Sequence, residues 1–341
     1  MLTVWQDYPP ELLTLDAGDL YQVLPGPTLI HLPGRRQPPL FVSVLLHGNE
    51  VTGWLAVRKL LQTYQDRELP RSLLVLIGNV AAARYGMRRL PDQPDYNRIW
   101  LPGDQPEHRL AAAVIAILKQ EGVFACVDVH NNTGRNPHYA CVAQLDPQTL
   151  QLATLFGRTV LYFTEASGVQ TMALSQLAPS VTLECGKPDH PHGIHHAYQY
   201  LQDCLHLDHI PNRPVPAQDL HLLHTIATLK IPEHLSFGFG AAAVDVMDLA
   251  FPEDLDELNF QECPPHTPIA RLRTPHAYLE VRDPQGQEVS ERFFYTDGDY
   301  LLTRQTLVPA MLTLNSRIIR QDCLGYLLEE YPLACSWPHS A

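Results

Sequence analysis

The chain has 341 residues, of which 45% are hydrophobic and 18% are charged, the balance of a soluble globular protein with material for one large core or two ordinary domains. Its 24 lysines and arginines stand against 37 acidic residues, which gives a formal net charge of -13. Binding to a nucleic acid or to a membrane surface requires clustered positive charge on the protein. We therefore expect neither as a partner.

The N-terminus and the cysteines indicate the cellular compartment in which we expect the protein. Residues 1–20 contain no basic segment followed by an apolar stretch, so we expect no signal peptide, and no apolar run is long enough to span a bilayer. The cysteines form neither a CxxC pair nor a dense framework, which favours reduced thiols in the cytoplasm, mostly as small buried residues. They lie at positions 126, 141, 185, 204, 263, 323 and 335.

Apolar, strand-like runs alternate with helical patterns over the first part of the chain. Strands are expected at 40–46, 72–80, 124–130, 138–144, 160–164 and 180–185, and helices at 52–65, 107–122, 147–160 and 193–207. Nearly continuous apolar strands separated by amphipathic helices indicate a sheet that is covered on both faces. We therefore predict an α/β domain with a mixed parallel and antiparallel sheet.

The pattern changes after IPNRPVPAQD, residues 210–219, which holds three prolines in ten residues and is typical of a boundary or a stiff linker. Beyond it come short strand-like runs, broken by prolines and Asp-Gly turn signals. These runs include HTIATLKI, YLEVRD, RFFYTDG and AMLTLNSRII. The sequence thus predicts a first domain over 1–212 and a smaller, β-rich domain over 213–341.

The first strand ends in an imidazole and a carboxylate. LFVSVLL is followed directly by His47-Gly48-Asn49-Glu50, where a tight turn would place the side chains of His47 and Glu50 on one side. One metal ion could then bind both groups. In a chain with 17 histidines such a pair also arises by chance, so by itself it indicates little.

A second apolar strand, CVDVH at 126–130, also ends in a histidine. Ligands of open α/β sheets collect at the carboxyl ends of strands, where both His47 and His130 are expected. Together with Glu50 they make two imidazoles and one carboxylate, a ligand set of hydrolytic zinc sites that keep a position for water. We interpret Asp128, two residues before His130, as a structural polar residue rather than as support for the ligand.

A third strand, SVTLEC at 180–185, carries Glu184 within an apolar run, where burial is costly without a purpose. Glu184 is the candidate base that would steer a water molecule and move its proton. Its alternative is a structural role, as a helix cap or a partner of Lys187. Cys185 would point to the opposite face, because strand residues alternate, and is interpreted as a core residue.

Two further stretches carry charge or imidazoles. In MRRLPDQPDYNRIW, residues 87–100, Asn97 and Arg98 could bind a carboxylate through an amide and a guanidinium, although a solvated loop explains the charges equally well. KPDHPHGIHHAYQY, residues 187–200, holds four histidines, but their spacing suits a loop leading into a helix better than an independent metal site.

Five motifs in a fixed order resemble one known family. HGNE, GNVAAARYGMRR, DYNR, DVHNNTG and TLECGK, spread over residues 40–200, resemble the succinylglutamate desuccinylase/aspartoacylase family of zinc carboxypeptidase-like hydrolases. The resemblance implies a three-layer zinc carboxypeptidase-like catalytic domain with a mixed sheet, beside a smaller β-rich C-terminal domain. It implies Zn²⁺ bound by His47, Glu50 and His130, with Glu184 activating water.

The resemblance also implies substrate contacts. Asn97 and Arg98 would hold the carboxylate of the product amino acid. An arginine upstream of them would polarise the scissile carbonyl, and because the segment before DYNR is one residue longer than the family pattern, Arg89 is the first choice and Arg88 the second.

The expected function is zinc-dependent hydrolysis of an amide bond in an N-acyl amino acid or a similar small amide. The alternatives are a carboxypeptidase-like enzyme for short peptides and an inactive, zinc-retaining binding module; the intact Glu184 argues against the latter. Aspartoacylase-like members carry an arginine before the catalytic glutamate for an acidic substrate, whereas residues 168–183 contain no cation, so Arg135 or Lys187 would have to replace it. A homo-oligomer is compatible with the sequence, which does not determine the oligomeric state.

Overall fold

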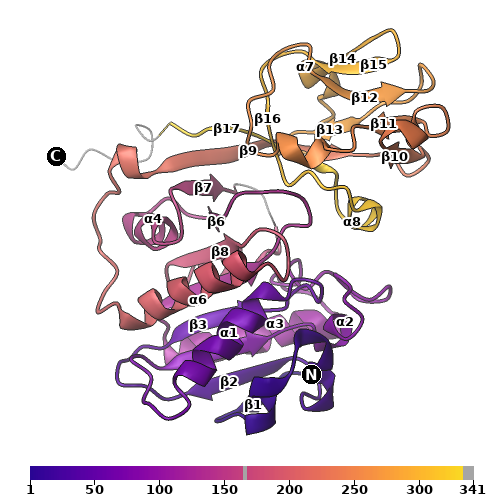
Figure 1. Cartoon of the computed structure of the whole chain (residues 1–341). Helices are drawn as coiled ribbons and strands as arrows, with labels where there is room; N and C mark the ends of the chain where they lie inside the picture. The colour runs from indigo at the N-terminus through magenta and orange to yellow at the C-terminus, as the bar shows by residue number, and fades with distance from the viewer. Residues whose placement is uncertain (164–166, 333–341) are drawn as a thin grey trace. The chain divides into compact units, whose positions relative to one another are not determined.

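The structure is a computed structural model that describes residues 1–163 and 167–332. The chain divides into two compact units (Figure 1). The first contains Met1–Asn131 and His138–Leu222, and the second contains Asn132–Pro137 and Leu223–Pro332. Within the described residues, no helix is both long and apolar enough to cross a membrane.

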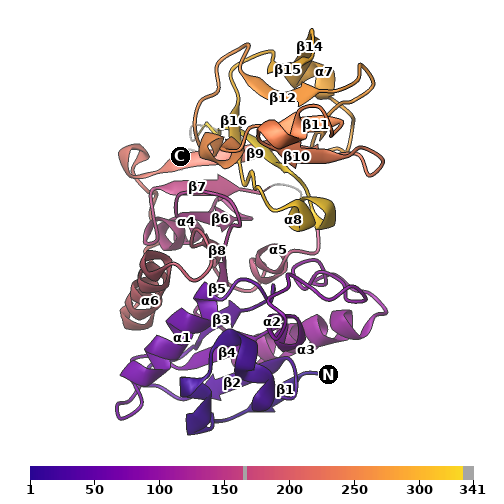
Figure 2. The ribbon, with the colours of Figure 1, turned by 45° about the vertical axis from the view of Figure 1, so that its right-hand side comes forward.

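The first unit is built on a mixed sheet with the strand order β1-β2-β4-β3-β5-β8-β6-β7, whose central part is visible in Figure 2. The strands are β1 (Thr3–Trp5), β2 (Thr28–Leu32), β3 (Leu40–Val44), β4 (Leu73–Ile77), β5 (Ala125–His130), β6 (Tyr139–Val142), β7 (Thr159–Tyr162) and β8 (Ser180–Glu184). Strands β4, β3, β5 and β8 run parallel to their neighbours in that row, whereas β2 pairs antiparallel with β4 and β6 antiparallel with β8.

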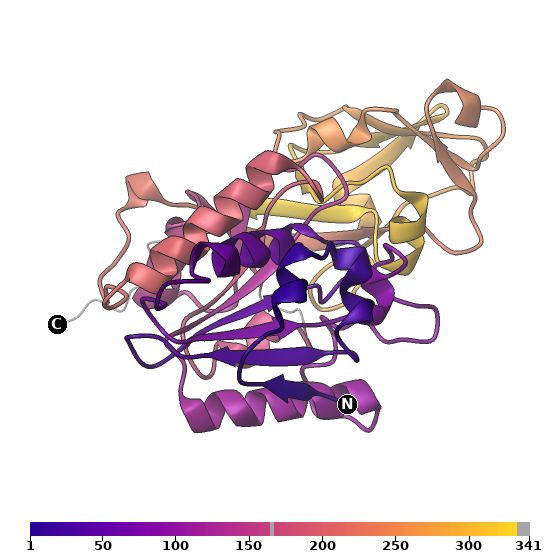
Figure 3. The ribbon, with the colours of Figure 1, turned by 60° about the horizontal axis from the view of Figure 1, so that its bottom comes forward.

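Helices cover both faces of this sheet. They are α1 (Thr52–Thr63), α2 (Val80–Ala83), α3 (Pro106–Glu121), α4 (Pro147–Thr154), α5 (Gln170–Leu174) and α6 (Pro191–His206). Figure 3 shows the sheet from its edge, with α3 on one side and α1 and α6 on the other. The apolar side chains of α3, such as Val114 and Leu118, pack with Phe41, Leu74 and Leu76 of the sheet in one buried cluster. This arrangement confirms the predicted α/β class with a mixed sheet.

Some local details differ from the sequence-based prediction. The helix expected over 147–160 ends at Thr154, whereas the strand expected at 160–164 is present as β7 and begins one residue earlier, at Thr159. The first strand ends at Val44 rather than at residue 46, because Leu45 adopts a positive φ of 57° and turns the chain. The sequence pattern also did not indicate β1 and β2, which lengthen the sheet beyond β4.

The second unit is rich in strands. They are β9 (His221–Lys230), β10 (Phe237–Phe239), β11 (Leu249–Phe251), β12 (Pro268–Leu272), β13 (Glu280–Arg282), β14 (Phe294–Asp297), β15 (Tyr300–Thr303), β16 (Val308–Ala310) and β17 (Gly325–Glu330). One sheet has the order β10-β11-β12-β15-β14; β9 pairs with β13 and β17, and β17 with β16. Residues of both groups of strands, including Leu229, Phe251 and Val281, share one buried cluster.

Part of the strand-like run AMLTLNSRII forms a helix instead. Helices α7 (Ser290–Phe293) and α8 (Ser316–Gln321) belong to this unit. The side chain of Asn315 accepts hydrogen bonds from the backbone nitrogens of Arg317 and Ile318, an N-cap that starts α8 within the predicted strand. Cys335, the last cysteine of the chain, lies outside the described residues.

Candidate metal centre

His47 and Glu50 converge through a turn at the end of β3. The backbone nitrogen of Glu50 donates to the carbonyl oxygen of His47 at 3.1 Å and closes the turn. Both side chains then lie on the same side, with His47 Nδ1 2.8 Å from Glu50 Oε1. The local spacing that the sequence contains is therefore sufficient to bring these two groups together.

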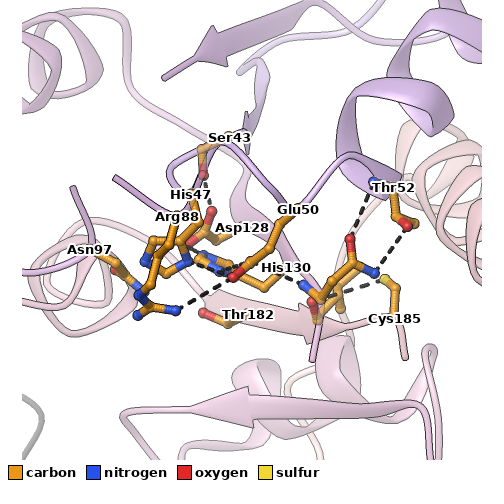
Figure 4. A network of polar contacts seen from close by, with 12 residues as sticks. Ser43, His47, Glu50, Thr52, Arg88, Asn97, Asp128, His130, Thr182 and Cys185 are labelled. Carbon is orange, nitrogen blue, oxygen red and sulfur yellow. Dashed lines mark hydrogen bonds and ion pairs between the residues drawn. The ribbon is translucent and has the colours of Figure 1, made fainter. Parts of the chain in front are cut away.

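His130, the last residue of β5, completes the cluster. Its Nδ1 lies 2.8 Å from Glu50 Oε2, and the candidate ligand atoms of His47, Glu50 and His130 all lie within 4.8 Å of one another. Figure 4 shows the three side chains pointing toward one another. Their exposed fractions are only 3%, 3% and 4%, so a bound ion would be shielded from bulk water.

Gly48 permits a close backbone approach beside this turn. A Cβ added at Gly48 would lie 2.2 Å from the backbone nitrogen of Ala83, so any larger residue would displace α2. The nitrogen of Gly48 donates to the carbonyl oxygen of Arg88 at 3.1 Å. The turn that holds His47 thus also fixes the backbone of Arg88.

Each imidazole is oriented by a second carboxylate. His47 Nε2 lies 2.9 Å from Asp95 Oδ1, and His130 Nε2 lies 2.7 Å from Asp128 Oδ2. An outer nitrogen that donates to a carboxylate leaves the Nδ1 lone pair directed at the cluster, which is the usual support of metal-binding histidines. Because residues 128 and 130 are two apart on a strand, they share a face. The contact favours support of His130 by Asp128 over the purely structural role that the sequence suggested.

Asp128 is held in turn by a buried polar chain. Ser43 Oγ lies 2.7 Å from Asp128 Oδ1 and 2.5 Å from Gln170 Oε1. One hydroxyl proton cannot serve both acceptors, and Gln170 Nε2 is buried without a partner among the described residues. An amide turned by 180° resolves both facts, because Gln170 Nε2 then donates to Ser43 and Ser43 donates to Asp128.

Asn131 ties three elements together at the end of β5. Its side-chain nitrogen donates to Thr52 Oγ1 at 3.0 Å and to the carbonyl oxygen of Gly186 at 2.9 Å, while its backbone nitrogen donates to Glu50 Oε2 at 3.1 Å. The start of α1, the end of β5 and the end of β8 are therefore linked beside the cluster. Sequence reasoning overlooked Asn131, Ser43 and Gln170, because their partners lie far away in the chain.

Glu184 occupies the neighbouring strand. It is the in-register partner of His130 across the parallel pair β5 and β8, so both side chains leave the sheet on the same face. Burial raises the pKa of Glu184 to about 7, with nearby His130 opposing and Glu50 reinforcing the shift. Its Oε2 is buried and has no hydrogen-bond partner among the described residues. A carboxyl group with these properties can exchange a proton near neutral pH.

Cys185, the residue after Glu184, is interpreted from the sequence as a core residue. It is fully buried, and burial raises the pKa of its thiol well above the ordinary value, with the charge of Glu184 adding to the effect. A thiol in such surroundings stays protonated and unreactive. The structure therefore agrees with its interpretation as a core residue.

The two candidate arginines lie in different surroundings. Arg88 is mostly buried: its Nη1 lies 3.6 Å from Glu50 Oε1, and its Nε and Nη2 contact Asp95 Oδ2 at 3.1 and 2.9 Å. Figure 4 shows its guanidinium ending beside Glu50. Arg89 instead donates from Nη1 to the carbonyl oxygen of Gln93 at 2.8 Å. Of the two, Arg88 is the one that the structure places at the cluster.

Asn97 and Arg98 lie after this loop. Asn97 is buried, and its Oδ1 accepts a hydrogen bond of 3.0 Å from the backbone nitrogen of Gln170. Its own backbone nitrogen donates to Asp95 Oδ1 at 2.8 Å. Arg98 is exposed and donates from Nη1 to the carbonyl oxygen of Asn97 at 2.9 Å. The carboxylate that orients His47 thus also fixes the position of Asn97.

The two cations proposed as replacements for the missing arginine are both exposed. Arg135 belongs to the second unit, where its guanidinium pairs with the carboxylate of Glu257. Lys187 follows the end of β8 and is exposed. Neither shows the burial that would mark a built carboxylate-binding site.

The donor set fits a zinc ion. Two imidazoles and a carboxylate are zinc ligands, and three protein ligands leave a position for a fourth group. Burial alone would raise the pKa of Glu50, but the neighbouring His47 and His130 lower it, so this carboxylate is ionised. Three further carboxyl groups lie next to these ligands: Asp95 contacts the outer nitrogen of His47, Asp128 that of His130, and Glu184 is the in-register neighbour of His130.

Known proteins resemble this chain in sequence and in fold. Residues 36–200 match the sequence model of the succinylglutamate desuccinylase/aspartoacylase catalytic domain. No curated protein matches the chain.

Several solved structures share the fold. The succinylglutamate desuccinylase from Chromobacterium violaceum is 18% identical with a TM-score of 0.57, covering 88% of this chain and 86% of that one. The succinylglutamate desuccinylase/aspartoacylase from Rhodobacter sphaeroides is 16% identical with a TM-score of 0.58, covering 88% of each chain. Murine aminoacylase 3 is 16% identical with a TM-score of 0.53, covering 87% of this chain and 97% of its own.

Proposed function

Residues 36–200 place the chain in the succinylglutamate desuccinylase/aspartoacylase family, whose members hydrolyse amide bonds, and from this premise we propose that the protein is a zinc-dependent hydrolase of N-acyl amino acids. The proposal rests on one observation. The buried side chains of His47, Glu50 and His130 meet at one place, and Glu184 lies in register beside His130. Zinc, held by these three ligands, would supply a Lewis acid for the substrate carbonyl and for water.

Glu184 is the proposed general base and acid. As a water oxygen attacks the carbonyl carbon, the Glu184 carboxylate accepts the water proton and later passes it to the nitrogen of the leaving amine, so the amide bond breaks without net consumption of protons by the enzyme. A pKa of about 7, raised by burial, suits both transfers, because the group loses and regains a proton at similar cost near neutral pH.

We assign the polarisation of the carbonyl to Arg88 in place of Arg89. Negative charge develops on the carbonyl oxygen as water attacks, and a preorganised donor lowers the energy of that state. The contacts of Arg88 with Asp95 and Glu50 hold its guanidinium at the cluster, whereas Arg89 is engaged with the backbone of Gln93.

Asn97 and Arg98 are the proposed clamp for the α-carboxylate of the amino acid. The buried Asn97 is held by Gln170 and Asp95 and would supply a fixed amide. The exposed Arg98 would supply a mobile guanidinium that closes on the carboxylate.

The domain division and the cellular compartment are also proposals. We propose that residues 1–212 are the catalytic domain and residues 213–341 a β-rich domain. We also propose a reducing compartment such as the cytoplasm, which is supported by five buried free thiols, those of Cys126, Cys141, Cys185, Cys204 and Cys263.

Elemental analysis combined with a substrate screen tests the proposal. We expect about one tightly held zinc per chain and measurable release of free amino acid from a panel of N-acyl amino acids, with dipeptides as the comparison set. Activity that survives complete removal of zinc by a chelator, or hydrolysis of dipeptides alone, contradicts it.

A further inference from the structure

A second group of imidazoles lies outside the candidate metal centre. His138 directly precedes β6, and His192 and His196 lie one turn apart near the start of α6. His138 Nδ1 is 2.8 Å from His196 Nδ1, and the ring centroid of His138 is 4.9 Å from that of His192. We call these three residues the His138 cluster.

Two members of the His138 cluster are packed against other rings, and the third is exposed. The ring of His196 is stacked on Phe156 at a centroid distance of 4.1 Å, and the ring of His138 is stacked on His196 at 5.1 Å. Both side chains are only partly exposed, whereas His192 is exposed to solvent. Two imidazoles are therefore packed in place, and the third lies beside them at the surface.

Two imidazoles of this cluster, those of His138 and His196, are held neutral at physiological pH. Burial lowers the pKa of His138 to about 4, and the neighbouring His196 and His192 lower it further in the same direction. Burial and His192 also lower the pKa of His196. Neutral imidazoles offer a lone pair, which is the form that binds transition metals.

The spacing of the histidines in residues 187–200 alone does not favour a metal site, but His138 joins them from another segment. We propose that the His138 cluster is a second metal site, which binds a divalent transition-metal ion such as Zn²⁺ through His138, His192 and His196. Histidines one turn apart on a helix face the same side and commonly share an ion. Zinc to nitrogen bonds of about 2.0–2.1 Å set tetrahedral ligands about 3.3 Å apart. To bind one ion, His138 and His196 would give up their hydrogen bond and turn their lone pairs toward one point. The ring of His192, whose centroid lies 6.2 Å from that of His196, would turn toward the same point.

The site would brace the strand that carries Glu184. Tyr139, next to His138, is the antiparallel partner of Glu184 on β8. On the other side, a Cβ added at Gly193 would lie 2.4 Å from the carbonyl oxygen of Cys185, so the first turn of α6 packs directly on the end of β8. An ion that joins His138 to α6 therefore ties together the two segments that flank this strand end.

The experiment counts zinc on the untagged, full-length protein. Calorimetric titration with Zn²⁺, and elemental analysis after dialysis, should show a second, weaker equivalent in addition to the zinc of the main centre. His192→Ala and His138→Gln should each weaken this second equivalent by at least about tenfold and leave the first unchanged. Excess zinc should also raise the melting temperature of the wild type more than that of His192→Ala, because a ligand that binds only the folded state stabilises it.

His195→Ala is the matched control, since His195 is exposed on the same helix with its ring near Tyr198. The control should keep both equivalents. The proposal is overturned if saturating zinc gives no second equivalent in the wild type, if that equivalent survives in both His192→Ala and His138→Gln, or if His195→Ala weakens it equally. The variants show which zinc equivalent belongs to the His138 cluster. If the main centre bound no zinc, the loss would therefore not be mistaken for any of these results.

Discussion

The imidazole of His130 and the carboxylate of Asp128 are in contact, with Nε2 2.7 Å from Oδ2. The two residues lie two positions apart on β5, so their side chains leave the strand on the same face. This contact fixes which nitrogen of His130 faces the cluster. The hydroxyl of Ser43, 2.7 Å from the other Asp128 oxygen, fixes the carboxylate in turn. The orientation of a proposed metal ligand thus depends on a buried chain that reaches from β5 to β3.

Loss of this contact should weaken zinc binding. We expect Asp128→Ala to lower zinc affinity by about 10- to 100-fold, because the ring of His130 loses the group that sets its tautomer and orientation. His47→Ala, Glu50→Ala and His130→Ala should each lose zinc altogether, since they remove a ligand. Competition with a chromogenic chelator measures the affinities, and the exposed Asp92→Ala serves as control. Unchanged affinity in Asp128→Ala would contradict the orienting role.

Glu184→Gln should separate binding from chemistry. The substitution keeps the shape of the side chain and removes its basicity, so kcat should fall by a factor of about 10² to 10⁴ while zinc content and KM change little. Cys185→Ala, one residue further along the chain, should keep most of the wild-type turnover because its thiol is an inert core group. Steady-state kinetics on one N-acyl amino acid, with zinc measured on the same samples, gives both results. Near wild-type turnover in Glu184→Gln would refute the role of the base.

Arg88 and Arg89 form a natural matched pair. Arg88→Ala should lower kcat by about 10² to 10³, the usual effect of losing a donor to a developing oxyanion, whereas Arg89→Ala should change it only slightly. Because Arg88 also contacts Asp95, zinc content is measured for both variants, so that a disturbed centre is recognised. If kcat falls in Arg89→Ala and not in Arg88→Ala, the first choice made from the sequence is right and our reassignment is wrong.

The absence of a cation in residues 168–183 predicts the substrate preference. An acidic side chain on the amino acid would lose its hydration at a cost of several kcal/mol without an opposite charge to offset it, whereas neutral or aromatic side chains carry no such cost. We expect a higher kcat/KM for N-acyl derivatives of neutral amino acids than for N-acetylaspartate or N-succinylglutamate. Arg98→Ala should raise KM for all of them alike. A tenfold preference for the diacids would show that another cation, such as Arg135 or Lys187, supplies the missing charge.

Acid sensitivity of the second unit should depend on Asp248. Hydrogen bonds from Ser236, followed by the contact with Arg273, lower the pKa of Asp248 below its ordinary value. A carboxyl group with a lowered folded-state pKa stabilises the fold above its unfolded pKa of about 3.9, and this stabilisation is lost as the pH falls through the folded value. Asp248→Asn should therefore lower the melting temperature at pH 7, and its difference from the wild type should shrink in acid. The exposed Asp245→Asn should show neither effect.

Much of this protein is determined by local sequence patterns. The alternation of apolar strands with amphipathic helices is sufficient to predict the α/β class, because each pattern reports the face that its own segment buries. The turn from His47 to Glu50 is likewise local, since a spacing of three residues around a tight turn leaves few ways to orient the two side chains. The positions of His130 and Glu184 at strand ends follow from the same patterns together with the rule for open α/β sheets.

Tertiary structure decided the features that depend on distant partners. Our assignment of Arg88 in place of Arg89 rests on its contacts with Asp95 and Glu50. The chain from Asp128 through Ser43 to Gln170 exists because β3, β5 and α5 meet in the core. The N-cap at Asn315 is a local feature, unlike these contacts. Hydrophobic periodicity does not reveal it, so part of a strand-like run forms α8. A sequence pattern encodes how one segment is buried, but contacts between segments are fixed only when the chain packs, because each side chain then has a single set of neighbours.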